Sequence, residues 1–385
     1  MDLSKHDAYR YPEYDDYMKL LWQNYWPNNI HLFDKVRHIY AGAHASMSFK
    51  WRPIESIIEE IKDFYQSGIR IFFFECLTEG VIIDGIEKIA KVALHFSNFP
   101  DIKLFYWSGD YTAEKHVNKH LGSIGIPKKF AVIGTSHLEL TGKTYPPYDK
   151  DYAVGPREKK FLCFNKVHRQ HRIDLLEYVV TNNLLDDSYY SFDCSEDNLE
   201  LLVNDINYPG IRSIKDRIPL ILNKTPERDN PVNIIEDDHK YFENTYFSVV
   251  TETLFYRDPI APKQRLMMHV PGTYPGRFVT EKTFKCIVMK HPFVVLGPYK
   301  MLEFMKSRGY KTFSPFIDES YDDIENDDER LLAVGNEIKR LCNLSEDELV
   351  RFTEFAKPIV EHNENVVRNV TDFTTINNLG DYITV

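Results

Sequence analysis

Residues 53–75 read PIESIIEEIKDFYQSGIRIFFFE, and this stretch decides the fold class. Its first part places apolar residues three and four positions apart, as the buried face of an amphipathic helix requires. Gly68 ends that pattern, and the run that follows, 69–75, is almost wholly apolar until Glu75. Such a run is typical of a strand that is buried on both faces of a parallel sheet. The stretch therefore predicts an α/β fold.

The same alternation recurs along the chain. Apolar runs at 36–42, 102–109 and 129–135 predict three further strands, and the 3–4 periodicity of 83–98 predicts another helix. The segment 141–160 contains three prolines and little periodicity, which is typical of a linker. Strand-like and helix-like segments alternate again beyond it, so we predict a second α/β layer structure.

Length and composition agree with two domains. The chain has 385 residues, which is long for one core, and 43% of them are hydrophobic and 14% aromatic, which excludes global disorder. We predict an N-terminal domain over 1–150, a C-terminal domain over 158–370 and a tail over 371–385. Two Rossmann-type domains that face a central cleft are the expected architecture.

Charge and cysteine content limit the location and the partners. The net charge of −11 opposes non-specific adhesion to nucleic acid, although a local basic groove stays compatible with it. The five cysteines have no metal-ligand spacing and indicate reduced thiols. No signal peptide and no apolar run of membrane-spanning length stand in the sequence. We expect a soluble cytoplasmic protein that does not bind membranes.

The segment RFVTEKTFKCIVMKHPFVVLG (277–297) carries the first candidate site. If a helix begins near Thr280, its unpaired backbone N–H groups and its dipole suit a phosphate, and Lys282 and Arg277 add cations. Glu281 beside them suits the ribose hydroxyls of a nucleotide. The alternative is an ordinary solvent-exposed helix start.

A second candidate lies in NKVHRQHR (165–172), at a predicted strand-to-helix turn. Asn165, Arg169 and Arg172 stand there, and arginine can grip diphosphate oxygens in a bidentate manner. In SVVTETLF (248–255), Thr251 and Glu252 end another predicted strand. Because ligands bind beyond the carboxyl ends of parallel strands, we expect all these residues at one crevice.

These segments carry a resemblance. VTEKTFKCIVMKHPFVVLGP (279–298) resembles the donor-binding segment of GT-B nucleotide-sugar glycosyltransferases, particularly the TEK segment of fucosyltransferase-like families. FLCFNKVHRQHRIDLLEYV (161–179) and GYKTFSPFIDESYD (309–322) are similar to a group of phage and viral glycosyltransferase-like proteins. The resemblance covers roughly 160–330, and the first 150 residues match nothing specific.

The resemblance implies a function. It implies that Glu281 and Lys282 contact a nucleotide-sugar, most simply a UDP-sugar, and that Thr251 and Glu252 face the donor sugar or base. The cations would stabilise the departing nucleoside diphosphate. No DxD motif follows a predicted strand, so we expect no obligatory metal or other cofactor.

The first domain would then supply the acceptor site and a catalytic base. Polar residues at its predicted strand ends are the candidates: Glu75 and Asp110 first, and His44 third. Each of these side chains is more often structural than catalytic, so the identity of the base stays open.

The acceptor is also open. The phage-like resemblance implies 5-hydroxymethylcytosine in DNA, with arabinose or glucose as the sugar, and a base in a duplex would have to be flipped out. A surface glycan or lipopolysaccharide is the alternative acceptor. A catalytically inactive nucleotide-binding GT-B shell is the alternative from another class. An NAD-dependent oxidoreductase is excluded because AGAHAS (41–46) is a poor substitute for the GxGxxG turn.

Overall fold

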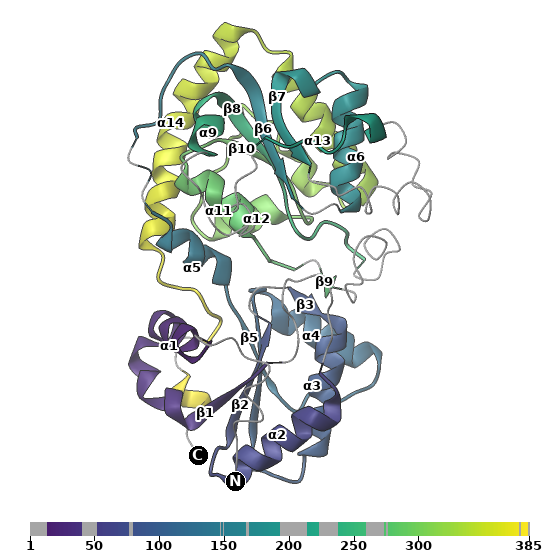
Figure 1. The fold of residues 1–385 in the computed structure, drawn as a ribbon, viewed down its shortest axis with the longest axis vertical. Helices are drawn as coiled ribbons and strands as arrows, with labels where there is room; N and C mark the ends of the chain where they lie inside the picture. Colours follow the sequence, from purple (N-terminus) through teal and green to yellow (C-terminus); the bar gives the residue numbers. More distant parts are fainter. Residues whose placement is uncertain are drawn as a thin grey trace. The chain divides into compact units, whose positions relative to one another are not determined.

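The computed structural model describes most of the chain. The residues that it describes are 14–40, 52–76, 80–146, 148, 150–166, 169–192, 214–222, 238–258, 273–274, 276–376 and 379–383. Within them, two four-stranded parallel sheets carry helices on their faces, which confirms the α/β class (Figure 1).

The chain forms two compact units. Unit 1 comprises Met1–His137, His269–Phe278 and Thr371–Val385, and unit 2 comprises Leu138–Met268 and Val279–Val370. This division differs from the predicted one, because unit 2 begins before the expected linker and the tail belongs to unit 1. Contacts explain both differences: Lys143 donates to the carbonyl of Val370, and the backbone N–H of Thr375 donates to the carbonyl of Gly134.

Unit 1 contains a sheet with the strand order β1-β2-β4-β5. Its described elements are α1 (Tyr14–Tyr25), η2 (Pro27–Lys35), β1 (Val36–Tyr40), α2 (Ile54–Gln66), β2 (Ile71–Cys76), β3 (Val81–Ile82), α3 (Ile83–His95), β4 (Lys103–Ser108), α4 (Ala113–Ser123), β5 (Ala131–Gly134), the first residue of α5 (His137–Thr144), β9 (Thr273–Tyr274) and α15 (Gly380–Ile383). The short strand β9 pairs antiparallel with β3, which draws the segment before α11 into unit 1.

The alternation of β2 and β4 builds two different cores in unit 1. Phe72 and Phe74 join the aliphatic cluster of α2, α3 and α4 on one face. Phe73 faces the other way, where its ring stacks on Phe105 at 4.7 Å and α1 contributes Trp22. Figure 1 shows α1 on the opposite side of the sheet from α2, α3 and α4. Both faces of the sheet are therefore buried, as the apolar strand runs predicted.

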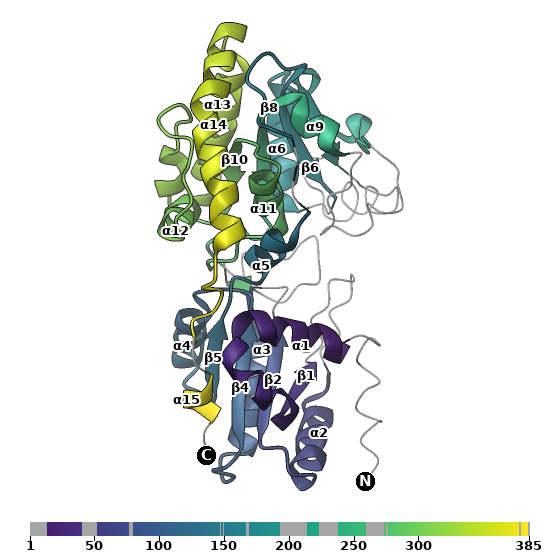
Figure 2. The same cartoon turned by 90° about the vertical axis from the view of Figure 1, so that its left-hand side faces the viewer.

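Unit 2 contains the sheet β10-β8-β6-β7. Its described elements, after the rest of α5, are β6 (Lys159–Asn165), α6 (Gln170–Thr181), η3 (Leu185–Asp187), β7 (Ser188–Phe192), η5 (Lys215–Arg217), α9 (His239–Glu243), β8 (Thr245–Thr251), α11 (Glu281–Val288), β10 (Phe293–Leu296), α12 (Met301–Ser307), η8 (Ser320–Asp323), α13 (Asp327–Cys342) and α14 (Glu346–Asn369). Helices α6 and α13 lie on one side of this sheet, and α11 and α14 on the other (Figures 1 and 2).

Local signals set several helix ends in unit 2. The side chain of Ser345 accepts from the backbone of Glu348, and the Glu348 carboxylate accepts from the backbone of Ser345, so the capping box of α14 is present. Asn326 caps α13 in a similar way.

Two other findings concern the cysteines and the helices. The four cysteines in the described part of the chain are buried and form no disulfide. None of the described helices is both long enough and apolar enough to cross a bilayer.

Candidate functional site

The strand order of unit 2 reverses at β6. From β6 the chain passes to β7 on one side and then to β8 on the other, so the reversal lies between β6 and β8. Asn165 ends β6 and Thr251 ends β8, and Oγ1 of Thr251 donates to Oδ1 of Asn165 at 2.5 Å. Open α/β sheets bind ligands in the crevice outside the carboxyl ends of the strands at such a reversal.

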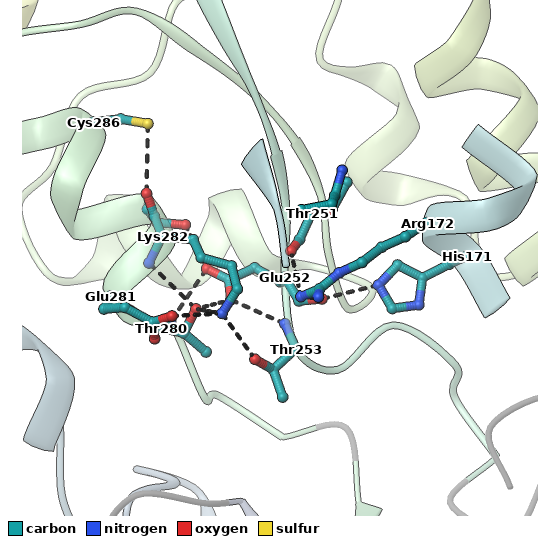
Figure 3. A network of polar contacts seen from close by, with 11 residues as sticks. His171, Arg172, Thr251, Glu252, Thr253, Thr280, Glu281, Lys282 and Cys286 are labelled. Carbon is teal, nitrogen blue, oxygen red and sulfur yellow. Dashed lines mark hydrogen bonds and ion pairs between the residues drawn. The ribbon is translucent and has the colours of Figure 1, made fainter. Parts of the chain in front are cut away.

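Helix α6 contacts the last residue of β8, Thr251, and the residue that follows it, Glu252. One guanidinium nitrogen of Arg172 donates to the carbonyl of Thr251 at 3.1 Å and, more weakly, to that of Glu252 at 3.5 Å. Nε2 of His171 donates to the Glu252 carbonyl at 2.9 Å. Figure 3 shows both side chains of α6 directed at this strand end. Arg172 is therefore a buried structural cation whose charge lies at the reversal.

Glu252 is the centre of the network. Its side chain is fully buried, and its carboxylate accepts four hydrogen bonds. The donors are the backbone N–H groups of Thr253 (3.2 Å) and Thr280 (3.1 Å) and the hydroxyls of Thr280 (2.5 Å) and Thr283 (2.5 Å). The carboxylate thus binds the start of α11 to the end of β8.

Helix α11 begins at Glu281, as the sequence predicts, and Thr280 is its N-cap. Nζ of Lys282 lies 2.7 Å from Oε1 of Glu281 and donates to Oγ1 of Thr253 at 3.2 Å and of Thr280 at 3.3 Å. The ammonium therefore reaches the same strand end that Arg172 contacts from α6 (Figure 3). We call these side chains the strand-end cluster; its members are Asn165, His171, Arg172, Thr251, Glu252, Thr253, Thr280, Glu281, Lys282 and Thr283.

Burial and neighbouring charges shift the pKa values in and beside this cluster. Burial, followed by the charge of Arg169, lowers the pKa of Arg172 to about 9. Burial lowers the pKa of Lys285, one turn after Glu281, to about 8. Burial alone would raise the pKa of Glu281, but the charges of Lys282 and Lys285 lower it overall. Burial of the charged Arg172 and Lys285 therefore costs free energy, and a further anion beside them would offset that cost.

Burial lowers the pKa of His171 well below its ordinary value, and the charge of Arg172 adds to this effect. The imidazole is therefore neutral, and its ring stacks on Phe255 at 5.3 Å. His171 supports the strand end without adding charge to it.

Arg277 and Asp110, both predicted as site residues, belong to unit 1. The backbone N–H of Arg277 donates to Oδ1 of Asp110 at 2.9 Å, and the backbone N–H and the hydroxyl of Thr112 donate to the same oxygen. Asp110 is fully buried, and burial raises its pKa. Its other oxygen, Oδ2, lies where a Cβ on Gly276 would stand. These contacts secure the segment before α11 and leave Asp110 enclosed.

Glu75, the first-named base candidate, lies at the end of β2 in unit 1. Its carboxylate contacts Nδ1 of His38 on the neighbouring strand β1. His38 packs among aromatic rings, with Phe73 at 5.4 Å between ring centroids. The third candidate, His44, lies outside the described residues. Across the described ranges, no group of three or more His, Cys, Asp or Glu residues is arranged to hold a metal ion.

Three members of the strand-end cluster were not predicted, His171, Thr253 and Thr283, and neither was Arg330, which lies beside the cluster. Thr253 and Thr283 each follow a glutamate by one or two positions, in TET and TEKT, and these flanking threonines are the signal that links the two glutamates. Arg330 lies in a stretch rich in acidic residues, and nothing local marks it.

Arg330 is almost completely buried and joins the loops that follow two strands. It donates to the carbonyls of Phe255 at 2.9 Å and Gly297 at 3.3 Å, beyond the ends of β8 and β10. It also donates to the carbonyl of Ile324 at 2.9 Å and to Asp327 at 2.6 Å. The strand ends beside the cluster are therefore fixed by a second buried arginine.

The strand-end cluster combines a sheet reversal, two cations from two helices and two carboxylates in one hydrogen-bonded network. No protein-family model matches this chain, and no curated protein matches it significantly.

Proposed function

We propose that unit 2 binds a nucleotide-sugar at the strand-end cluster and that the protein is a nucleotide-sugar-dependent glycosyltransferase of GT-B type. The observation that carries the proposal is the convergence of Lys282 and Arg172 on residues 251–253, beside the reversal of strand order. This is the position at which parallel α/β sheets take nucleotides. Lys282 is the cation that can contact a diphosphate, and the buried charge of Arg172 adds to the positive potential at the same strand end.

The charge balance supports an anionic ligand. Arg169, the N-cap of α6, and Lys285 border the cluster and influence the pKa values of its charged members. When both are included, four cations accompany three carboxylates, those of Glu252, Glu281 and Asp238, whose charge acts on Lys285. A diphosphate would offset this excess of positive charge, and the same cations would stabilise the negative charge that grows on the departing nucleoside diphosphate.

Glu281 has a separate role in this proposal. Its carboxylate accepts from Lys282 and is nearly buried at the first position of α11. A ribose offers two hydroxyl donors, which match a carboxylate that stays ionised because its pKa is lowered. Glu281 would thus recognise the nucleoside, while Lys282 recognises the phosphates.

The proposal also includes an acceptor and a catalytic base. We propose a hydroxyl on a modified base, 5-hydroxymethylcytosine in DNA, with arabinose or glucose as the transferred sugar. Glu75 is the preferred base because its carboxylate lies at a strand end. Asp110 suits this role less well, because its carboxylate is enclosed.

The test is a binding screen of the purified chain against UDP- and GDP-sugars by thermal shift, followed by mass spectrometry of duplexes with and without 5-hydroxymethylcytosine. Stabilisation by one donor and a sugar-sized mass gain on the modified duplex alone are expected. Donor binding without a mass gain would redirect the acceptor to glycans. If no nucleotide-sugar binds, the proposal is wrong.

A further inference from the structure

The carboxylate of Glu252 is saturated by donors from its own unit. A carboxylate offers about four lone-pair sites, and four donors occupy Oε1 and Oε2 here. The side chain has no exposed surface. A sugar hydroxyl therefore has no vacant acceptor position on Glu252, although the resemblance implied that this residue faces the donor sugar or base.

The same carboxylate uses the positive end of α11. Anions are stabilised at a helix N-terminus by the helix dipole, and Glu252 binds both the N-cap Thr280 and the third helical residue, Thr283. An external phosphate would consequently depend on the Lys282 side chain more than on the backbone of α11. Of the backbone N–H groups at this helix start, those of Thr280 and Lys282 already donate to the Glu252 carboxylate and to Oγ1 of Thr280.

Glu252 also holds the two threonines that the Lys282 ammonium contacts besides Glu281. Nζ of Lys282 donates to the hydroxyls of Thr253 and Thr280, and these two residues are fixed by their own hydrogen bonds to Glu252. The carboxylate is thus one step removed from the ammonium and holds both of its threonine partners.

We infer that Glu252 is a positioning residue: it anchors the first turn of α11 to the end of β8 and thereby sets the Lys282 ammonium for an anionic ligand. The anchoring depends only on the contacts above. The identity of the ligand, a nucleoside diphosphate, rests on the proposed function.

The decisive variant is Thr283→Val, which removes one donor to Glu252 and nearly preserves the side-chain shape. The matched control is Thr245→Val, because Thr245 is an equally buried threonine at the other end of β8, where its hydroxyl donates to the carbonyl of Tyr241. Glu252→Gln is the stronger variant, since a glutamine offers one acceptor oxygen in place of two.

Two readouts are needed. Hydrogen exchange, which needs no ligand, should be roughly tenfold faster at the amide of Thr280 in Thr283→Val than in the wild type or the control. Titration with UDP and with inorganic pyrophosphate should show roughly tenfold weaker binding of both ligands for Thr283→Val, and little change for Thr245→Val.

Each failure has its own meaning. Unchanged exchange at Thr280 in both Thr283→Val and Glu252→Gln would overturn the anchoring. Faster exchange with unchanged affinity would overturn the positioning role while the proposed function stands. If the wild type binds neither UDP nor pyrophosphate, the proposed function fails, and exchange still decides whether Glu252 is an anchor.

Discussion

Nζ of Lys282 lies 2.7 Å from Oε1 of its neighbour Glu281, so that one cation and one carboxylate share the first turn of α11. Their proposed roles differ, because the ammonium would bind phosphate and the carboxylate would bind ribose. Pyrophosphate contains only the first of these groups, whereas UDP contains both. The two residues can therefore be separated with two ligands.

We expect Lys282→Ala to weaken binding of both UDP and pyrophosphate by about 10- to 100-fold, the cost of a hydrogen bond to a charged group. Glu281→Gln should weaken UDP binding about tenfold and leave pyrophosphate binding unchanged or stronger. Isothermal titration calorimetry measures both, with Lys306→Ala on α12 as the control because Lys306 pairs with Glu319 elsewhere in unit 2. Equal losses for both ligands in Glu281→Gln would contradict the ribose assignment.

The strands were predictable because they are buried on both faces. The run 69–75 became β2 (Ile71–Cys76) and the run 102–109 became β4 (Lys103–Ser108), with ends displaced by one or two residues. The order of the strands was not predictable, since pairing between distant segments leaves no local pattern. The reversal beside β6, which locates the candidate site, therefore became visible only in the folded chain.

The role of Glu252 could not be predicted from the sequence pattern. A carboxylate at a strand end is equally compatible with a ligand contact and with a helix anchor, and the choice depends on where α11 packs. The start of α11 was predictable because Thr280 is a good N-cap and Glu281 suits a first turn. The contact of this helix start with Glu252 joins segments that are distant in the sequence, and it makes Glu252 a structural member of the site.

Binding of an anion should depend on pH through Lys285. In the ligand-free protein, burial lowers the pKa of this ammonium to about 8, and a bound diphosphate would raise it. Lys285 is then mostly protonated in the complex at a pH where the free protein has lost the proton. Affinity should consequently fall as pH rises above about 8, by up to about tenfold per pH unit for one proton.

Calorimetry of UDP binding at pH 8.5, in two buffers that differ in ionisation enthalpy, measures this proton uptake. We expect proton uptake in the wild type and less in Lys285→Arg, because arginine is the stronger base; the uptake that remains belongs to Arg172, whose pKa burial lowers to about 9. An affinity that stays constant between pH 7 and 9.5 would show that Lys285 does not face the ligand.

Gly276 should be intolerant of any side chain. A Cβ at this position would lie 1.6 Å from Oδ2 of Asp110, and that carboxylate is held by Thr112 and by the backbone N–H of Arg277. We expect Gly276→Ala to destabilise unit 1 by at least about 1–3 kcal/mol, the usual cost of overpacking. Gly122→Ala in α4 is the control, since nothing lies within 4 Å of its added Cβ and alanine favours the helix by up to about 1 kcal/mol.

Urea unfolding of the single variants and of Gly276→Ala combined with Asp110→Gly tests this contact. The loss caused by Gly276→Ala should shrink when Asp110 is shortened, giving a clear coupling energy. Additive losses would mean that the clash is relieved by movement of the backbone instead.

Acid should destabilise unit 2 through His291. Burial lowers the pKa of this histidine to about 3, and its ring nitrogens bond to Ser248 and to the carbonyl of Thr245. In the unfolded chain a histidine has a pKa of about 6.5. Below that pH the unfolded chain binds a proton that the folded unit excludes, so the free energy of unfolding should fall by up to about 1.4 kcal/mol per pH unit down to about pH 3.

The measurement is urea unfolding of the wild type and of His291→Gln between pH 7.5 and 5. The variant should be less stable at pH 7.5, because it loses one of the two ring contacts, but its stability should fall less steeply with acid. The remaining slope in unit 2 belongs partly to His171, whose pKa burial also lowers. If the free energies of unfolding of the two proteins fall in parallel with pH, His291 takes up its proton in the folded state. The histidine is then not held neutral by burial.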